Sequence, residues 1–393
     1  MYDYLIVGAG FCGAIIASEL TRKLHKRVLV VEKRAHVAGN MYDAVNEAGI
    51  LVQHYGPHAF HTDDRRIFEY LCQFASFKKY ELKCQVMIEG KTVASPFNLQ
   101  AIEDLFPEEK ARALKQALKY TYGTVTKTCI LELLKSKNPL IRAYAQYLFE
   151  HDYRPYTLKQ WGLKPEELDI SILQRVPVLF TYEDRYFADR FQALPECGYT
   201  ELFKKMLTHA KIDVLLNTDA LTKLNFDQRK KVLTYPDLRP GGTVIFTGAV
   251  DSLFKYEFGA LPYRSLNFVY KTLATDEYQK APIVAYPLAS GYTRITEYKK
   301  LPVQNIPGQT TIAIEYPLQY EASSRKITEP YYPIITQDDK AKYDLYLKQA
   351  RQYRNLFLCG RLADYKYYNM DAAIARAFAV FKEIERGELS DEI

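Results

Sequence analysis

The chain has 393 residues, of which 48% are hydrophobic, and its formal net charge is +6. This length allows two or three domains, and the apolar share predicts a sizeable core. The sequence has no apolar run long enough to cross a bilayer and no block of basic residues, so we expect neither a membrane span nor a nucleic-acid partner.

Cysteine and tyrosine usage narrows the expected class of protein. The six cysteines include no CxxC pair, which indicates neither a zinc ribbon nor a disulfide framework and favours a reducing cytoplasm. The N-terminal MYDYLIVGAG lacks a basic segment and a cleavage site, so we interpret it as a first strand and not as a signal peptide. The chain holds 33 tyrosines but one tryptophan, and tyrosine suits stacking on sugars and bases and donation to phosphates.

The N-terminal segment carries a dinucleotide-binding pattern. An apolar run is followed by GxGxxG, in which the glycines are Gly8, Gly10 and Gly13. An apolar-periodic helix comes next, and a second apolar run ends at Glu32. The glycines allow a tight turn and close approach to a pyrophosphate, and the acid takes ribose hydroxyls. We therefore predict a dinucleotide site, the alternative being a glycine turn in an unrelated α/β unit.

The loop after Glu32 favours FAD over NAD. It reads KRAHVAGN and closes a glycine turn at Asn40, a basic, glycine-containing loop typical of FAD-binding Rossmann-type proteins. The sequence has no second GxGxxG fingerprint for NAD(P)H, which is a further difference from a simple reductase.

Later segments are predicted to complete the same domain. Residues 213–224, 241–251 and 354–361 are expected to be strands that return to the N-terminal sheet. A helix over about 371–386 would direct its positive end at the flavin ring, with Asn369 as one candidate N-cap and Asp371 as another.

The middle of the chain is predicted to be partly helical and partly strand. Residues 107–122 and 138–149 are expected helices, the second with an Asn-Pro start, and the segment between them is a candidate mobile lid. Residues 262–320 alternate in polarity and predict antiparallel strands. We expect 80–97 and 171–193 to join that sheet.

The predicted fold class is α/β, with a Rossmann-type FAD-binding domain, a helical domain and an antiparallel β-sheet domain. The predicted boundaries are 1–78, 198–256 and 345–390 for the FAD-binding domain, 98–168 for the helical domain with its lid, and 79–97, 169–197 and 257–344 for the sheet domain.

Arginines and aromatic residues recur in separate polar segments. A single one is more often a surface group or, for Trp161, a helix-end aromatic side chain. Together on a FAD protein they favour a diphosphate clamp, because arginine grips phosphate bidentately and tyrosine adds donors without charge. The candidates are Tyr156, Trp161, Arg175, Tyr186, Arg294 and Tyr316, with Arg361 and Tyr367 directly before the last helix.

The segment HYGPHAFHT places His54, His58 and His61 close together. No acid or cysteine completes a ligand set, so we expect no metal site. Histidines that line a flavin face are the favoured interpretation.

The order of these motifs resembles the UDP-galactopyranose mutase family, FAD-dependent bacterial enzymes that contract a sugar ring. The resemblance spans nearly the whole chain and rests on MYDYLIVGAG, YGPHAFHT, YTLKQWG, RVPVLFT, RYFADRFQ, FGALPYRSL, YTRITE, EYPL, PYYP and GRLADYKYYNM. It implies that N5 of reduced FAD attacks the anomeric carbon of UDP-galactopyranose and displaces UDP, which returns once the sugar has become the furanose, with no net redox change. It also implies a cytoplasmic homodimer.

The resemblance further implies roles for individual residues. Arg175, Arg294 and His61 would be catalytic, the two arginines by gripping the diphosphate. Substrate contacts are expected from Tyr153, Tyr156, Trp161, Arg175, Tyr186, Arg294, Tyr316 and Tyr367, with Tyr156 stacked on uracil. FAD contacts are expected from Gly8, Gly10, Cys12, Gly13, Glu32, Lys33, Asn40, His58, Ala59, Val214, Gly360, Arg361, Asn369, Met370 and Asp371.

Four positions depart from the family pattern. Asn369 stands where the family usually has Asp, Leu82 and Ala285 where it has Asn, and Pro155 where it has Gly. These departures leave the sugar open, so that UDP-N-acetylgalactosamine or dTDP-fucose is an alternative substrate. An amine-oxidase-type flavin oxidoreductase and a FAD-fold protein retained for binding are further alternatives.

Overall fold

The computed structural model describes residues 1–163, 176–321 and 329–391. Its N-terminal strands belong to a five-stranded parallel sheet in the order β12–β2–β1–β15–β21. These strands are β1 (Tyr2–Val7), β2 (Val28–Val31), β12 (Ile212–Leu215), β15 (Leu238–Phe246) and β21 (Leu356–Leu358). The predicted return of the three later segments to the N-terminal sheet is therefore confirmed.

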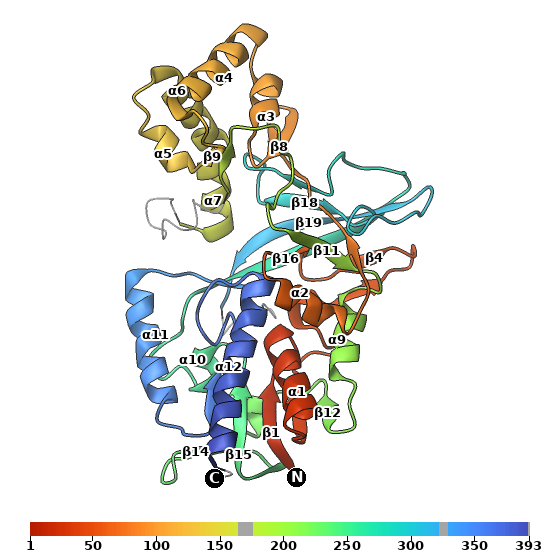
Figure 1. The fold of residues 1–393 in the computed structure, drawn as a ribbon, viewed down its shortest axis with the longest axis vertical. Coiled ribbons are helices and arrows are strands. Elements are labelled where there is room, and N and C mark those ends of the chain that lie inside the picture. Colours follow the sequence, from red (N-terminus) through yellow and green to blue (C-terminus); the bar gives the residue numbers. More distant parts are fainter. Residues whose placement is uncertain (164–175, 322–328, 392–393) are drawn as a thin grey trace.

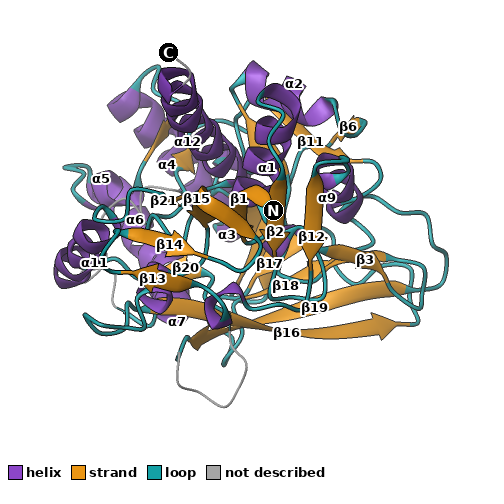
Figure 2. Cartoon of the chain, turned by 90° about the horizontal axis from the view of Figure 1, so that it is seen from below, coloured by secondary structure: helices purple, strands orange, loops and turns teal. Residues whose placement is uncertain are grey.

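The strands of this sheet carry apolar side chains on both faces, so helices cover both faces. Ile6 and Val30 pack in one core with α1 (Phe11–Lys23), α9 (Tyr199–Leu207) and α12 (Met370–Asp391). Leu5 and Val31 pack in a second core with α10 (Val250–Leu253) and α11 (Gln337–Ala350). Figure 2 shows α1 and α12 side by side over the strands, in agreement with their mutual contacts.

A seven-stranded sheet forms the centre of the molecule in Figure 1, in the order β20–β16–β19–β18–β17–β7–β8. Its pairs are antiparallel except β17 with β7. The strands are β7 (Cys84–Ile88), β8 (Lys91–Ser95), β16 (Tyr263–Leu273), β17 (Ile283–Ala285), β18 (Arg294–Glu297), β19 (Thr310–Gln319) and β20 (Tyr332–Pro333). The predicted antiparallel strands over 262–320 and the addition of 80–97 are confirmed.

The expectation that 171–193 joins this sheet is wrong for its described part. Strand β10 (Val178–Leu179) pairs with β9 (Lys127–Thr128), and β11 (Phe191–Pro195) lies between β5 (Phe60–Thr62) and β6 (Phe77–Lys79). Alternating polarity predicts a strand but does not select its partner, which long-range packing decides. The remaining short elements are β3 (Asp43–Val45), β4 (Leu51–Gln53), β13 (Asn225–Asp227), β14 (Val232–Thr234), α2 (Arg65–Cys72), η1 (Gly39–Met41) and η4 (Ala220–Thr222).

The helical part forms the end of the molecule opposite the two termini (Figure 1). Asn138 begins α6 as predicted, since its Oδ1 accepts the backbone N–H groups of Leu140 and Ile141. In the candidate lid, Ile130 and Leu133 are fully buried, so this segment packs on the helical core. The helices are α3 (Leu99–Leu105), α4 (Glu108–Tyr122), α5 (Ile130–Leu134), α6 (Pro139–Leu148), the π-helical turn η2 (Phe149–Tyr153) and α7 (Arg154–Trp161). Across the ranges that the structure covers, no helix has both the length and the apolarity for a membrane span.

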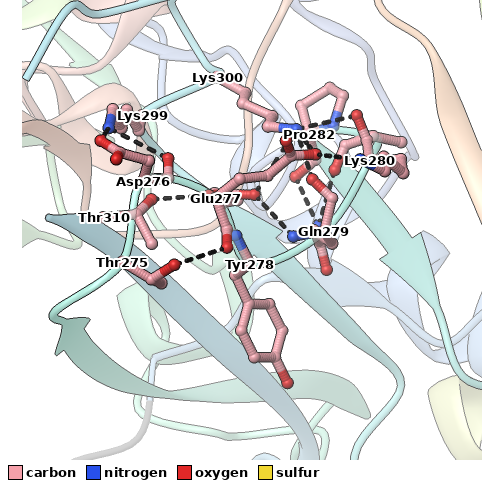
Figure 3. A network of polar contacts seen from close by, with 12 residues as sticks. Thr275, Asp276, Glu277, Tyr278, Gln279, Lys280, Pro282, Lys299, Lys300 and Thr310 are labelled. Atoms are coloured by element: carbon pink, nitrogen blue, oxygen red, sulfur yellow. Dashed lines mark hydrogen bonds and ion pairs between the residues drawn. The ribbon is translucent and has the colours of Figure 1, made fainter. Parts of the chain in front are cut away.

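A polar network holds the connection between β16 and β17 against β18 (Figure 3). The buried carboxylate of Glu297 accepts the backbone N–H groups of Tyr278 and Gln279, each at 3.0 Å, and the hydroxyl of Thr310 at 2.7 Å. Lys300 adds an ion pair with Glu277 at 2.9 Å. This network stabilises β18, which carries Arg294 at its other end.

Candidate active site

Two cavities meet near the N-terminus of α12. The first, of about 430 Å³, follows the ends of β1 and β2 and the loop that leads into α1. The second, of about 280 Å³, lies among α7, η2 and the seven-stranded sheet. Both are lined by Arg361, Asn369 and Met370. Ligands in the two cavities would therefore be neighbours.

The first cavity has the cradle of a dinucleotide site. Gly8 has φ +107°, and a Cβ on it would lie 2.1 Å from the hydroxyl of Thr247. A Cβ on Gly13 would lie 2.0 Å from the carbonyl oxygen of Gly8, so this glycine lets α1 pack against β1. The loop thus leaves room for a pyrophosphate at the helix N-terminus.

Glu32 is held at the end of β2 by two backbone groups. Its carboxylate oxygens accept the N–H groups of Ala9 and Arg34, each at 2.9 Å. A carboxylate can accept further hydrogen bonds, so Glu32 fits the ribose hydroxyls of a dinucleotide. The Arg34 guanidinium lies 4.3 Å from the Tyr55 ring centroid and donates to Asn40 at 3.0 Å. The sequence interpretation missed Arg34, which lines the first cavity, although Arg34 lies in the basic loop KRAHVAGN.

Most of the predicted cofactor residues line one of the two cavities. Those at the first cavity are Gly8, Gly10, Cys12, Glu32, Lys33, Asn40, Gly360, Arg361, Asn369 and Met370, and those at the second include His58 and Ala59. Three predicted residues do not line either. Gly13 serves helix packing, Val214 lines a separate hollow beside Leu216, and Asp371 accepts the N–H of Ala372 within the first turn of α12.

Arg294 is the main cation of the second cavity. Its Nε and Nη2 both lie 2.7 Å from Oε2 of Glu315, the residue opposite it on β19. Glu315 is 2% exposed. A buried carboxylate in this position keeps the guanidinium charged and fixes its orientation.

Arg361 lies over a pair of stacked tyrosines where the cavities join. The rings of Tyr332 and Tyr367 are 5.4 Å apart and nearly parallel, and the guanidinium is 5.1 Å and 5.2 Å from their centroids. Its nitrogens also donate to the carbonyl oxygens of Tyr331 and Tyr368. The sequence interpretation did not include Tyr332, although the PYYP motif contains it.

The two predicted histidines differ in their surroundings. Burial, with Arg361 and Arg294 nearby, lowers the pKa of His58 to about 3, so its ring is neutral. His61 Nδ1 lies 3.0 Å from Oδ2 of Asp189, and its ring stacks on Phe187 with centroids 3.5 Å apart. The carboxylate orients the His61 ring at the cavity wall.

The helical side of the second cavity is built from η2 and α7. The predicted residues Tyr153, Tyr156 and Trp161 line this cavity. Asp152 lines it as well, although the sequence did not predict it. Lys159 ties α7 to the loop between β17 and β18, because its Nζ donates to three backbone carbonyl oxygens at 2.6 to 2.8 Å. This contact fixes α7 relative to the strand that carries Arg294.

Among the predicted substrate residues that the structure describes, Tyr316 does not line the cavity. Tyr316 lies beside Tyr292, with ring centroids 6.1 Å apart. Its neighbour Glu315 is directed at Arg294, and successive strand side chains point to opposite faces, so Tyr316 faces away. Arg175 lies outside the described residues. The cavity wall does include the predicted residues Tyr186 and Tyr367. It also includes Leu82, Ala285 and Asn369, three of the positions that differ from the family pattern.

Comparison with known proteins gives concordant matches. A family model described as UDP-galactopyranose mutase matches residues 152–367, and one described as an NAD(P)-binding Rossmann-like domain matches residues 6–74. The chain is 36% identical to the UDP-galactopyranose mutase of Mycoplasma genitalium over 377 residues, which cover 95% of this chain and 92% of that protein. It is 32% identical to the dTDP-fucopyranose mutase of Escherichia coli, with 96% and 97% covered.

A solved structure has a similar fold. A crystal structure of reduced UDP-galactopyranose mutase matches with a TM-score of 0.73 at 16% identity and covers 98% of this chain and 94% of that one. At this identity the likeness shows the fold. The predicted α/β class with a Rossmann-type domain is therefore confirmed.

Proposed function

The chain belongs to the UDP-galactopyranose mutase family, which makes it an isomerase, and on that premise we propose that it interconverts the pyranose and furanose forms of UDP-galactose. One observation carries the proposal for this site. The cavity with the dinucleotide cradle and the cavity with Arg294 share Arg361, Asn369 and Met370. A cofactor in the first cavity can therefore contact a diphosphate sugar in the second.

We propose FAD as the cofactor. The glycine cradle and Glu32 fit a dinucleotide, and the first cavity joins the second at the N-terminus of α12, where a flavin ring would lie. Reduced FAD, when bound, would supply a nucleophile for the anomeric carbon and an overall reaction without net redox change. The residues proposed to hold it are Gly8, Gly10, Cys12, Glu32, Lys33, Asn40, His58, Ala59, Gly360, Arg361, Asn369 and Met370.

Arg294 is proposed to bind the diphosphate and to stabilise the charge that develops as it leaves. Its pairing with Glu315 holds the guanidinium in one orientation before substrate binds. Tyr186 and Tyr367 would add hydroxyl donors without adding charge. Arg175 is proposed as the second diphosphate ligand and Tyr156 as the stacking partner of the base, as the family resemblance implies.

His58 and His61 are proposed to lie beside the flavin. A neutral His58 adds no further positive charge next to the two arginines. When the His61 ring is neutral, its hydrogen bond to Asp189 places the proton on Nδ1 and leaves Nε2 as an acceptor. We also propose a homodimeric, cytoplasmic enzyme, in line with the family.

A second substrate has its own support. The dTDP-fucopyranose mutase of Escherichia coli is nearly as similar in sequence as the mutase of Mycoplasma genitalium. Leu82 and Ala285, which replace asparagines of the family pattern, both line the second cavity. Loss of two amide side chains there would favour a less polar sugar such as the 6-deoxy sugar fucose.

The decisive experiment is anaerobic turnover with purified, flavin-loaded protein. We would reduce the flavin with dithionite, add UDP-galactofuranose, dTDP-fucose or UDP-N-acetylgalactosamine in separate reactions, and follow ring isomers by chromatography. We expect conversion of UDP-galactofuranose by the reduced enzyme only. Conversion of another sugar alone would reassign the substrate, and equal activity of the oxidised enzyme would exclude the reduced flavin as nucleophile. Release of peroxide with an amine substrate would identify an oxidase instead.

A further inference from the structure

Asp152 stands on an irregular turn of the helical part. The π-helical turn η2 joins α6 to α7 without a break in the helix, and Pro155 follows within the first turn of α7. Proline has no N–H to donate and its ring displaces the carbonyl group one turn earlier, which favours a widened turn. Turns of this kind are frequent at functional sites. The consequence here is that Asp152 is directed at the second cavity, whose wall it forms with Tyr153 and Tyr156.

Strand β7 borders the part of the second cavity that Asp152 lines, a part called here the η2 corner. The turn η2 packs against β7, and Gln85 of that strand lines the same cavity. Oε1 of Gln85 is buried and has no hydrogen-bond partner in the described part of the chain. Desolvation is the only cause of the shift in the pKa of Asp152, with no hydrogen bond or charge of a described residue contributing to it. Buried polar atoms are almost always paired, so Gln85 Oε1 would gain a partner from a donor bound in this cavity.

Burial raises the pKa of Asp152 to about 7. Near neutral pH its carboxyl group can therefore carry a proton and donate a hydrogen bond. Tyr153, Tyr156, Tyr186 and Cys84 line the same cavity as Asp152. The charged side chains next to Asp152 along the chain have partners: His151 Nε2 lies 3.4 Å from Glu89, and Arg154 Nη1 lies 3.5 Å from Glu150. The main cation of the cavity, Arg294, is paired with Glu315.

The position of this corner selects the part of the substrate that reaches it. The sugar must lie near Arg361, Asn369 and Met370, where the two cavities join. The turn η2 connects α6 to α7, which lie in the upper part of Figure 1, whereas α12 lies in the lower part. The base of the nucleotide would therefore lie at η2, where Tyr156 is proposed to stack on it. The edge of uracil or thymine offers a donor, N3–H, between two carbonyl acceptors.

We propose that Asp152 and Gln85 select an imide-bearing pyrimidine, with Gln85 Oε1 accepting N3–H and the Asp152 carboxyl donating to the adjacent carbonyl oxygen. This inference rests on the proposed function, because it takes the substrate to be a pyrimidine nucleotide-sugar. The proposal gives Asp152 and Gln85 a role in base specificity. Cytosine and N3-alkylated bases are excluded because they lack the N3–H donor. A base-free diphosphate should be indifferent to both residues.

The test compares ligand affinities of the flavin-loaded protein, measured by calorimetry with UDP, N3-methyl-UDP, CDP and pyrophosphate. The wild type should bind UDP at least about tenfold more tightly than N3-methyl-UDP or CDP, the loss expected for one buried hydrogen bond. Gln85→Leu should reduce the ratio of UDP to N3-methyl-UDP affinity to near one, whereas Asp152→Leu should weaken both ligands alike, and both variants should leave pyrophosphate affinity unchanged. Asp152→Asn keeps a donor and should retain the UDP affinity of the wild type near neutral pH.

The pH dependence is a second readout that a merely structural role would not change. The affinity of the wild type for UDP, divided by that of Asp152→Asn at the same pH, should fall between pH 6 and pH 8.5 as Asp152 loses its proton. Comparing two proteins with one ligand removes the titration of the phosphates. An unchanged ratio of UDP to N3-methyl-UDP affinity in Gln85→Leu, or an unchanged UDP affinity in Asp152→Leu, would overturn this proposal alone. A wild type that neither binds UDP nor converts any nucleotide-sugar would overturn the proposed function instead.

Discussion

Arg294 and Glu315 form a cross-strand pair in which two guanidinium nitrogens contact a single carboxylate oxygen, each at 2.7 Å. The pair joins β18 to β19 directly at the wall of the second cavity. Glu315 is almost fully buried, so loss of the arginine would leave its side chain without its ion-pair partner. The same contact thus stabilises the sheet and orients the proposed diphosphate ligand.

Replacement of Arg294 should affect both roles. We expect Arg294→Ala to lose turnover and about 3–5 kcal/mol of unfolding free energy, since it leaves a buried carboxylate unpaired. Flavin content should stay near that of the wild type. Turnover assays, urea unfolding and the flavin spectrum measure the three quantities.

Arg294→Lys is the matched control, because it keeps the charge but not the two-pronged geometry. It should recover part of the stability and little of the turnover. Wild-type turnover in Arg294→Ala would contradict the diphosphate role.

Gly8→Ala should lower flavin content. The added Cβ would meet the hydroxyl of Thr247 at 2.1 Å and the backbone has φ +107°, so contact and strain act together. Gly259→Ala is the matched control, with φ +86° and nothing within 4 Å of the added Cβ. Both variants should lose about 1 kcal/mol or more of unfolding free energy through backbone strain, but only Gly8→Ala should lose flavin. Equal flavin content in the two proteins would refute the cradle.

Lys159→Met should loosen the loop between β17 and β18. Three carbonyl oxygens lose a donor, and we expect a loss of about 1–3 kcal/mol in unfolding free energy together with a raised KM. Urea unfolding and initial-rate kinetics check this. Lys119→Met, on the exposed face of α4, should change neither quantity. A KM equal to that of the wild type would show that the loop needs no such anchor.

The pH dependence of stability should differ between wild type and Asp152→Asn. Asp152 has a folded-state pKa of about 7, above its unfolded value of 3.8. The folded state then holds a proton that the unfolded state releases, so this group adds stability below pH 4 and loses that stability as pH rises to 7. The difference in unfolding free energy between the two proteins should change by at most about 1.4 kcal/mol per pH unit in this window. Urea unfolding at pH 5 and pH 8 measures it, and parallel curves would rule out the raised pKa.

Much of the fold could be predicted because its signals are local. The strand-glycine-helix pattern up to Glu32 is contiguous, and the structure holds it in a parallel sheet as expected. The start of α6 at Asn138 followed from two adjacent residues. The assignment of 171–193 to the large sheet failed, since alternation does not identify a strand's neighbour.

The candidate site also has features that the sequence predicted and features that it did not. The residue types followed from the sequence, because motif spacing directly specifies the glycine cradle and the Arg and Tyr content of the segments that carry the candidate site. Tertiary packing alone sets the pairing of Arg294 with Glu315, the stacking of Tyr332 on Tyr367, the outward direction of Tyr316, and the presence of Asp152 and Gln85 at one cavity. The physical reason is that register across strands and the direction of a side chain at a helix irregularity depend on contacts between distant segments, which no short stretch of sequence encodes.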